Sequence, residues 1–64
     1  MSKIYYAYIP SAGASERVSQ KKIRQELKKQ GMAQDYNIER IHRGETVKTD
    51  FAEYSLIPRG RVLQ

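Results

Sequence analysis

The chain has 64 residues and no cysteine, and its twelve Lys or Arg against seven Asp or Glu give a net charge of +5. Without cysteine the chain has no disulfide and no thiolate metal ligand, and the single His42 cannot form a metal site alone. No apolar run approaches the roughly 20 residues of a membrane-spanning helix. We therefore expect one small cytoplasmic domain with no cofactor, metal or small-molecule substrate, and with no membrane association.

A first strand is predicted over residues 3–9, because aromatic and β-branched side chains dominate this segment. Alternation places Tyr6 and Tyr8 on one face of the strand and Tyr5 and Ala7 on the other. Both faces are largely apolar, which indicates a strand that is central or covered on both sides. Residues 10–14, with a proline and a glycine, predict a loop after it.

A helix is predicted between Ser19 and Gly31. Ser19 suits the N-cap, where its hydroxyl accepts a backbone N–H of the first turn, and Gly31 suits the left-handed residue that ends a helix. Ile23 and Leu27 lie four residues apart and form a narrow core stripe. An alternative start at Ser15 would lengthen this helix by one turn.

Three short segments follow the helix. Residues 36–42 predict a second strand, and residues 45–49 a third that runs back after a turn. Residues 51–56 predict either a continuing strand or a single helical turn that begins at Asp50. The resulting order is β-α-β-β.

The fold class expected from this order is α+β, with one basic amphipathic helix packed on a two- or three-stranded sheet. The domain would cover residues 1–57. Residues 58–64 would form a flexible basic C-terminal tail.

No catalytic constellation is visible in the sequence. A nucleophile needs an adjacent base, and Ser11 and Ser55 have only His42 as a candidate. Asp50 and Glu53 are a candidate carboxylate pair, but so short a chain rarely builds a cleft as well as a core. We expect a protein without catalytic residues that acts by binding a larger partner.

The helical segment carries most of the net charge. Residues 15–31 hold six basic and two acidic side chains, which leaves +4 of the total +5 there. Cationic side chains at this density suit contacts with DNA phosphates, and an ordinary solvated helix face is the alternative. The candidate nucleic-acid-binding residues on this helix are Lys21, Lys22, Arg24, Lys28 and Lys29.

A second basic feature lies near the end of the chain. Pro58-Arg59-Gly60-Arg61 resembles the core of AT-hook peptides, although Val62 stands where that family has a second proline. The resemblance implies that Arg59 and Arg61 enter the narrow minor groove of A·T-rich DNA, where the negative potential is concentrated. Both arginines are therefore added to the candidate nucleic-acid-binding residues.

Five tyrosines are many for so short a chain. Some must fill the core, and an exposed tyrosine makes a good binding anchor because it buries a large area at low entropy cost. We take Tyr5, Tyr8 and Tyr54 as candidates for contact with a protein partner. Base stacking is a further possible use of an exposed tyrosine.

The order of motifs over residues 4–56 faintly resembles the start of the serine recombinase (resolvase/invertase) catalytic domain. The matching segments are Tyr6–Ser11, a basic helix that closes at Gln30–Gly31, then Gly44 and Lys48–Asp50. Tyr8 and Phe51 stand where that family has arginines, and Pro10 stands at the nucleophile. The resemblance thus implies a catalytically silent relative.

In size, charge and lack of cysteine, the chain is also similar to phage excisionases and recombination directionality factors. This similarity implies an accessory factor of phage or mobile-element type that binds DNA, a recombinase or integrase, or both, and biases the direction of recombination. The alternatives are a protein-interaction module, such as a phage-encoded inhibitor that docks on an acidic host protein, and an RNA- or ribosome-associated basic protein.

Overall fold

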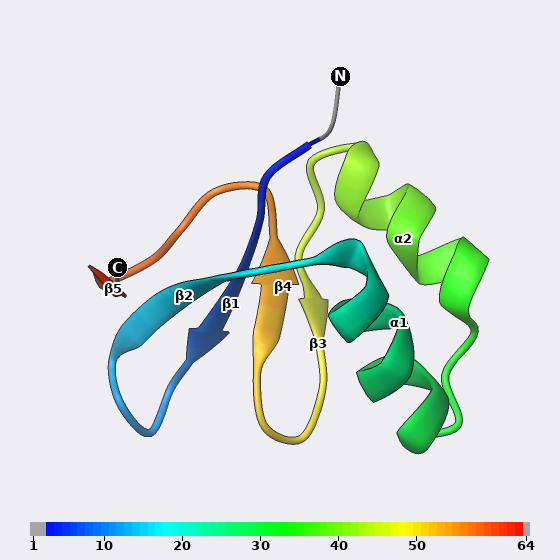
Figure 1. The fold of residues 1–64 in the computed structure, drawn as a ribbon, viewed down its shortest axis with the longest axis horizontal. Helices are drawn as coiled ribbons and strands as arrows, with labels where there is room; N and C mark the ends of the chain where they lie inside the picture. The colour runs from blue at the N-terminus through cyan, green and yellow to red at the C-terminus, as the bar shows by residue number, and fades with distance from the viewer. Residues whose placement is uncertain (1–2, 64) are drawn as a thin grey trace.

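The computed structural model describes residues 3–63, which form a mixed five-stranded sheet and two helices (Figure 1). The elements in chain order are β1 (Tyr5–Ile9), β2 (Ala14–Val18), α1 (Gln20–Lys29), α2 (Gln34–His42), β3 (Val47–Lys48), β4 (Glu53–Ser55) and β5 (Arg61–Leu63). The strands are arranged β3-β4-β1-β2-β5, and every pair is antiparallel except β2 with β5. The predicted α+β class is confirmed, although the sheet has more strands and the domain more helices than we expected.

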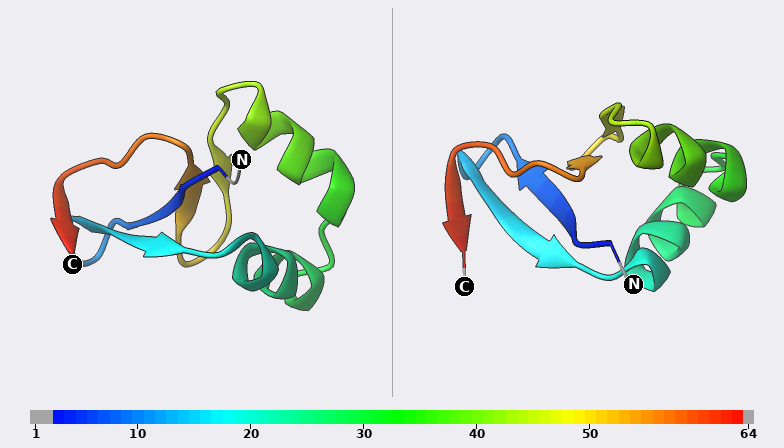
Figure 2. Two further views of the ribbon diagram at one scale, coloured as in Figure 1. Left: turned by 45° about the horizontal axis from the view of Figure 1, so that its top comes forward. Right: turned by 90° about the horizontal axis from the view of Figure 1, so that it is seen from above.

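β1 is the central strand, as its apolar composition predicts. Tyr5 and Ala7 face the helices and are buried, whereas Tyr6 and Tyr8 lie half-buried on the opposite face, called here the open face. The helices pack on one side of the sheet only (Figures 1 and 2). The core cluster comprises Tyr5, Ala7, Ile23, Leu27, Ile38, Ile41, Val47, Ala52 and Tyr54.

α1 has the boundaries that its sequence predicts. The Ser19 hydroxyl accepts the backbone N–H of Lys22 at 3.1 Å, and Gly31 closes the helix with a φ of 69°. Ile23 and Leu27 are fully buried, as expected of the core stripe. The alternative start at Ser15 is wrong, because residues 14–18 form β2 and pair with β1.

The predicted strand over residues 36–42 is wrong, because this segment is helical and forms α2. Ile38 and Ile41 lie three residues apart, and the helix turns both onto the core against α1. Asn37 is also buried, and its side-chain amide donates to the Ala33 carbonyl at 2.6 Å. The spacing of Ile38 and Ile41 suits an amphipathic helix. Packing of these side chains against α1 favours the helical period of 3.6 residues over the strand period of two.

β3 and β4 lie within the segments predicted for them. β3 falls inside residues 45–49, and β4 falls inside residues 51–56, so the strand alternative for the latter segment is the one observed. No described helix has the length and apolar character needed to cross a membrane.

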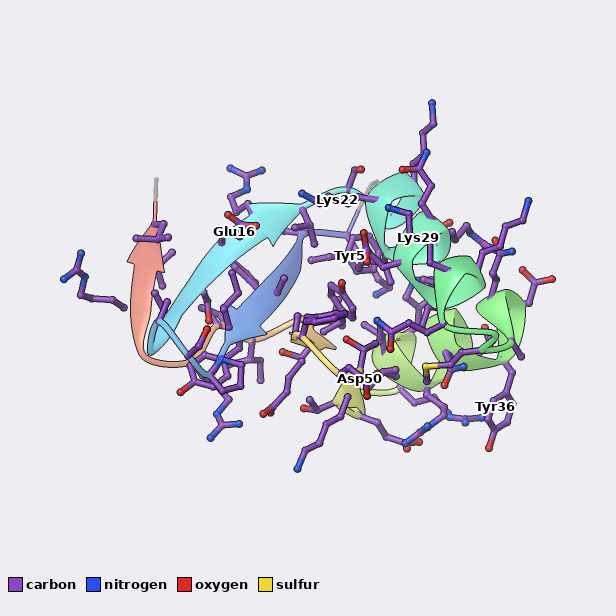
Figure 3. The ribbon with its side chains drawn as sticks, turned by 90° about the horizontal axis from the view of Figure 1, so that it is seen from below. Tyr5, Glu16, Lys22, Lys29, Tyr36 and Asp50 are labelled. Atoms are coloured by element: carbon purple, nitrogen blue, oxygen red, sulfur yellow. The ribbon has the colours of Figure 1, made fainter. Side chains whose placement is uncertain are left out.

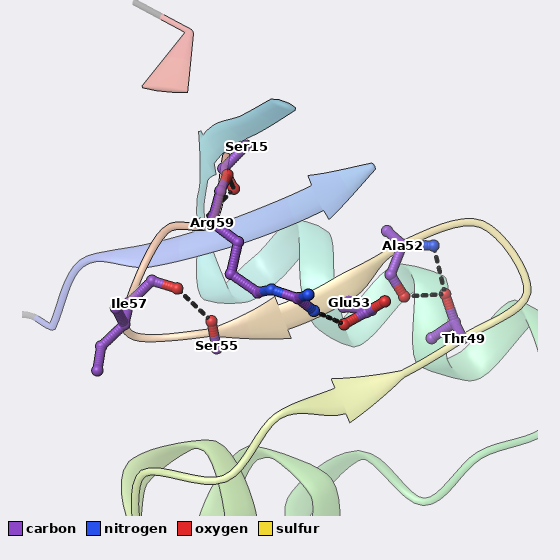
Figure 4. A network of polar contacts seen from close by, with 7 residues as sticks. All are labelled: Ser15, Thr49, Ala52, Glu53, Ser55, Ile57 and Arg59. Atoms are coloured by element: carbon purple, nitrogen blue, oxygen red, sulfur yellow. Dashed lines mark hydrogen bonds and ion pairs between the residues drawn. The ribbon is translucent and has the colours of Figure 1, made fainter. Parts of the chain in front are cut away.

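The C-terminal segment expected to be a flexible tail is part of the sheet through residue 63. β5 pairs in parallel with β2, and the connection from β4 to β5 (residues 56–60, the crossover) runs past Ser15. The fully buried Ser15 hydroxyl donates to the Arg59 carbonyl at 2.6 Å and accepts the Arg59 N–H at 2.8 Å (Figure 4). The segment is ordered because β5 hydrogen-bonds to the outer edge of β2 and the Arg59 backbone bonds to Ser15. These partners are distant in sequence, so local sequence does not reveal them.

Candidate nucleic-acid interface

The outer face of α1 is formed by lysines. At 100° per residue, Lys21 and Lys28 form one row and Lys22 and Lys29 a second row, both pointing away from the buried stripe of the same helix. All four side chains are exposed, and Figure 3 labels Lys22 and Lys29 on this helix. We call these four residues the lysine face.

The lysine face is almost free of neutralising partners. Lys21, Lys22 and Lys28 form no ion pair within residues 3–63, and Lys29 lies 3.6 Å from Glu26 with 73% of its side chain exposed. An exposed pair of this length contributes little and exchanges readily. The face therefore keeps its positive charge available to a partner.

Arg24, also predicted to bind nucleic acid, has a different role in the structure. Its guanidinium lies 2.7 Å from the Asp35 carboxylate and donates to the Gln20 side-chain oxygen at 3.0 Å. Gln20 in turn donates to the Tyr5 hydroxyl at 2.9 Å, and that hydroxyl lies 2.7 Å from Nε2 of His42. The Tyr5 hydroxyl thus links Gln20 of α1 to His42 of α2. Arg24 thus anchors a hydrogen-bond chain that ties α1 to α2 and β1.

Arg59 is likewise engaged inside the molecule. Its guanidinium lies 2.7 Å from the Glu53 carboxylate (Figure 4). It also lies 4.7 Å from the centre of the Tyr8 ring, which it covers on the open face. Arg61 belongs to β5, at the opposite end of the domain from the helices (Figure 2). The structure therefore does not bring these two arginines together with the lysine face.

The tyrosines predicted as protein-contact anchors are not available for that role. Tyr5 and Tyr54 are core residues with 6% and 5% exposure, and Tyr8 lies beneath Arg59. The exposed aromatic side chains are instead Tyr36 on α2 and Phe51 in the β3–β4 loop, at 63% and 74% exposure. Sequence reasoning missed both: Tyr36 lies in the segment interpreted as a strand, and Phe51 lies in the segment left open between a strand and a helical turn.

The ionisation of Tyr54 reflects its burial. Burial raises the pKa of this phenol above its usual 10.0, and the nearby Glu26 and Glu16 carboxylates add to the rise. Glu26 lies beside the lysine face, because its carboxylate is also 3.6 Å from the Lys29 ammonium group. Within residues 3–63, no three His, Cys, Asp or Glu side chains gather where they would hold a metal ion.

Comparison with known proteins gives no relative from which to transfer a function. No protein-family model, curated protein or solved structure matches this chain. The resemblances to serine recombinases and to excisionases therefore stay predictions from the residues quoted above. What the described residues do supply is a free cationic helix face, anchored to a core on its other side.

Proposed function

We propose that this protein is a non-enzymatic binder of duplex DNA that lays the lysine face along the phosphate backbone. The observation that carries the proposal is the absence, within residues 3–63, of any ion pair at Lys21, Lys22 and Lys28. The fully buried stripe fixes the helix, and three unpaired ammonium groups on it are free to contact phosphates.

The dimensions of α1 suit this role. Its ten residues span about 15 Å, and a helix with its side chains is about 10–12 Å wide, close to the roughly 12 Å of the major groove. Lysine contacts phosphates as a point charge and reads no base sequence by itself, so the binding would be strongly salt-dependent. α2 is unsuited to the same task, because its exposed side chains include Asp35 and Glu39.

The finer role proposed for this binding is that of an accessory factor in phage or mobile-element DNA recombination. It rests on the similarity to excisionases and recombination directionality factors in size, charge and composition. Such a factor would act by binding one of two DNA–recombinase assemblies more tightly than the other. A recombinase that contacts the protein while DNA occupies the lysine face would be its second partner.

The direct test is the affinity for a duplex of about 20 base pairs, measured by fluorescence anisotropy over a series of salt concentrations. The test variant carries Lys21→Gln, Lys22→Gln and Lys28→Gln. Each lost phosphate contact should reduce the magnitude of the slope of log K against log salt by about 0.9, so the three together should reduce it by about 2.7. Glutamine has nearly the helix propensity of lysine, so α1 should remain folded.

The matched control removes the same charge elsewhere. Arg43→Gln, Lys48→Gln and Arg61→Gln also lower the net charge from +5 by three, at positions exposed outside α1. This control should keep most of the affinity. Equal loss in both triple variants, or no binding by the unmodified protein at low salt, would contradict the proposal.

Two other outcomes would point to the alternatives. A pull-down could recover an acidic protein through a nuclease-resistant interaction that needs the same three lysines. That result would favour a protein-interaction module, and it would overturn the DNA proposal if the duplex does not bind. Tighter binding to structured RNA than to duplex DNA at equal salt would favour an RNA-associated protein.

A further inference from the structure

Two pockets flank Arg17 at the end of β2. The larger, of about 750 Å³, lies among the start of β1, the end of β2 and the first turn of α1, and His42 contributes to its wall. The smaller, of about 410 Å³, lies where β2 extends past β5. Arg17 lines both of them.

The larger pocket suits an anion. Its lining residues include the cations Lys3 and Arg17 and no carboxylate. Neither cation forms an ion pair within residues 3–63. The His42 imidazole completes this wall and is already hydrogen-bonded through Nε2 to the Tyr5 hydroxyl.

The smaller pocket has the opposite character. It is lined by Tyr6 of β1, Glu16 and Arg17 of β2, and Val62 and Leu63 of β5. Tyr6 and Arg17 are directly opposite each other in the β1–β2 register, so their side chains share the open face. An aromatic ring beside a guanidinium and apolar walls is the chemistry that stacks a nucleobase.

The accessibility of Tyr6 follows from where the crossover and β5 end. Arg59 of the crossover covers Tyr8 but belongs to the other end of β1, and β5 pairs with β2 only from Ala14 to Glu16. Beyond Glu16 the second edge of β2 has no strand partner among the described residues. Arg17 is exposed there, and the half-buried Tyr6 lines the smaller pocket beside it.

We propose that the Arg17 end of the β1–β2 hairpin binds one nucleotide unit of single-stranded nucleic acid. The phosphate occupies the larger pocket between Lys3 and Arg17, and the base stacks on Tyr6 in the smaller pocket. Arg17 bridges the two because it lines both. This site shares no residue with the lysine face, so single-strand binding can be tested separately from duplex binding.

The test compares two labelled single-stranded probes of about eight nucleotides, one ordinary and one abasic with the same number of phosphates. The unmodified protein should bind the ordinary probe at least about fivefold more tightly, the smallest factor expected from one base–aromatic stack. Tyr6→Leu should remove this preference, whereas Arg17→Gln should weaken binding of both probes.

Three matched variants make the test decisive. Tyr36→Leu removes an exposed tyrosine on α2 and should leave the preference for bases unchanged. Tyr6→Phe keeps the aromatic face and should also preserve it, which guards against loss of folding in Tyr6→Leu. The Lys21, Lys22 and Lys28 triple variant should lose duplex affinity and still discriminate between the single-stranded probes.

The proposal is overturned if the unmodified protein binds the ordinary and abasic probes equally. It is also overturned if a folded Tyr6→Leu variant, checked by its thermal transition, retains the preference, or if Arg17→Gln changes neither affinity. Failure of duplex binding with retained base preference would reject the proposed function alone.

Discussion

α1 and the segment that runs from Pro58 into β5 are both basic, and the sequence predicts DNA contacts for both. In the structure their cations differ. The lysine face of α1 stays largely unpaired, whereas Arg59 is held by Glu53, by the Tyr8 ring and, through its backbone, by Ser15. The comparison teaches that a run of basic residues supplies charge, but the tertiary partners decide whether that charge is available.

Gly60 shows the same difference at the level of the backbone. In the AT-hook resemblance this glycine lets the chain approach the floor of a DNA groove. Here Gly60 approaches the Gly13 backbone, and a Cβ placed on it would overlap the Gly13 carbonyl oxygen. The Arg-Gly-Arg unit therefore serves packing of the crossover against the β1–β2 turn.

The largest effect is expected for Gly60→Ala. The left-handed backbone costs a residue with a Cβ about 1–2 kcal/mol, and the overlap adds about 1–3 kcal/mol. Gly13→Ala is the matched control, because its φ of 62° is nearly the 61° of Gly60 while its Cβ would meet no atom within 4 Å. Urea unfolding should show the greater loss of stability for Gly60→Ala, and equal losses would break the comparison.

A smaller effect is expected at the cations themselves. Arg59→Gln removes an ion pair and a cation–π contact, each worth up to about 1 kcal/mol at an exposed site, so we expect a loss of about 1 kcal/mol. Lys28→Gln removes no contact of this kind and should change the free energy of unfolding by less than about 0.5 kcal/mol. The reverse order in urea unfolding would mean that Arg59, and not Lys28, is the free cation.

The smallest effect at neutral pH is expected for Tyr54→Phe, which tests the burial of this phenol beside Glu26 and Glu16. Because the pKa of Tyr54 is raised in the folded state, the unfolded chain loses this proton first as the pH rises past its usual 10.0. Stability associated with Tyr54 is therefore complete below pH 10 and declines above it. Tyr54→Phe should unfold with a weaker dependence on pH in that alkaline range, and unchanged alkaline dependence would contradict the assignment.

The parts of the fold predicted correctly are those governed by neighbours in sequence. The Ser19 cap, the Gly31 end and the Ile23–Leu27 stripe act within a few residues of one another, so α1 follows from local rules. The exposure of the lysine face follows from the same helical period. α2 was missed because the spacing of Ile38 and Ile41 was not recognised as helical.

The sequence by itself determined the net charge, the α+β class and the helix that presents the lysines. Only the tertiary structure decided that Arg59 is engaged, that Tyr5 and Tyr54 are core residues, and that Arg17 lies between two pockets of different character. The physical reason is distance along the chain: Ser15 and Arg59 are 44 residues apart, and no local propensity encodes their contact.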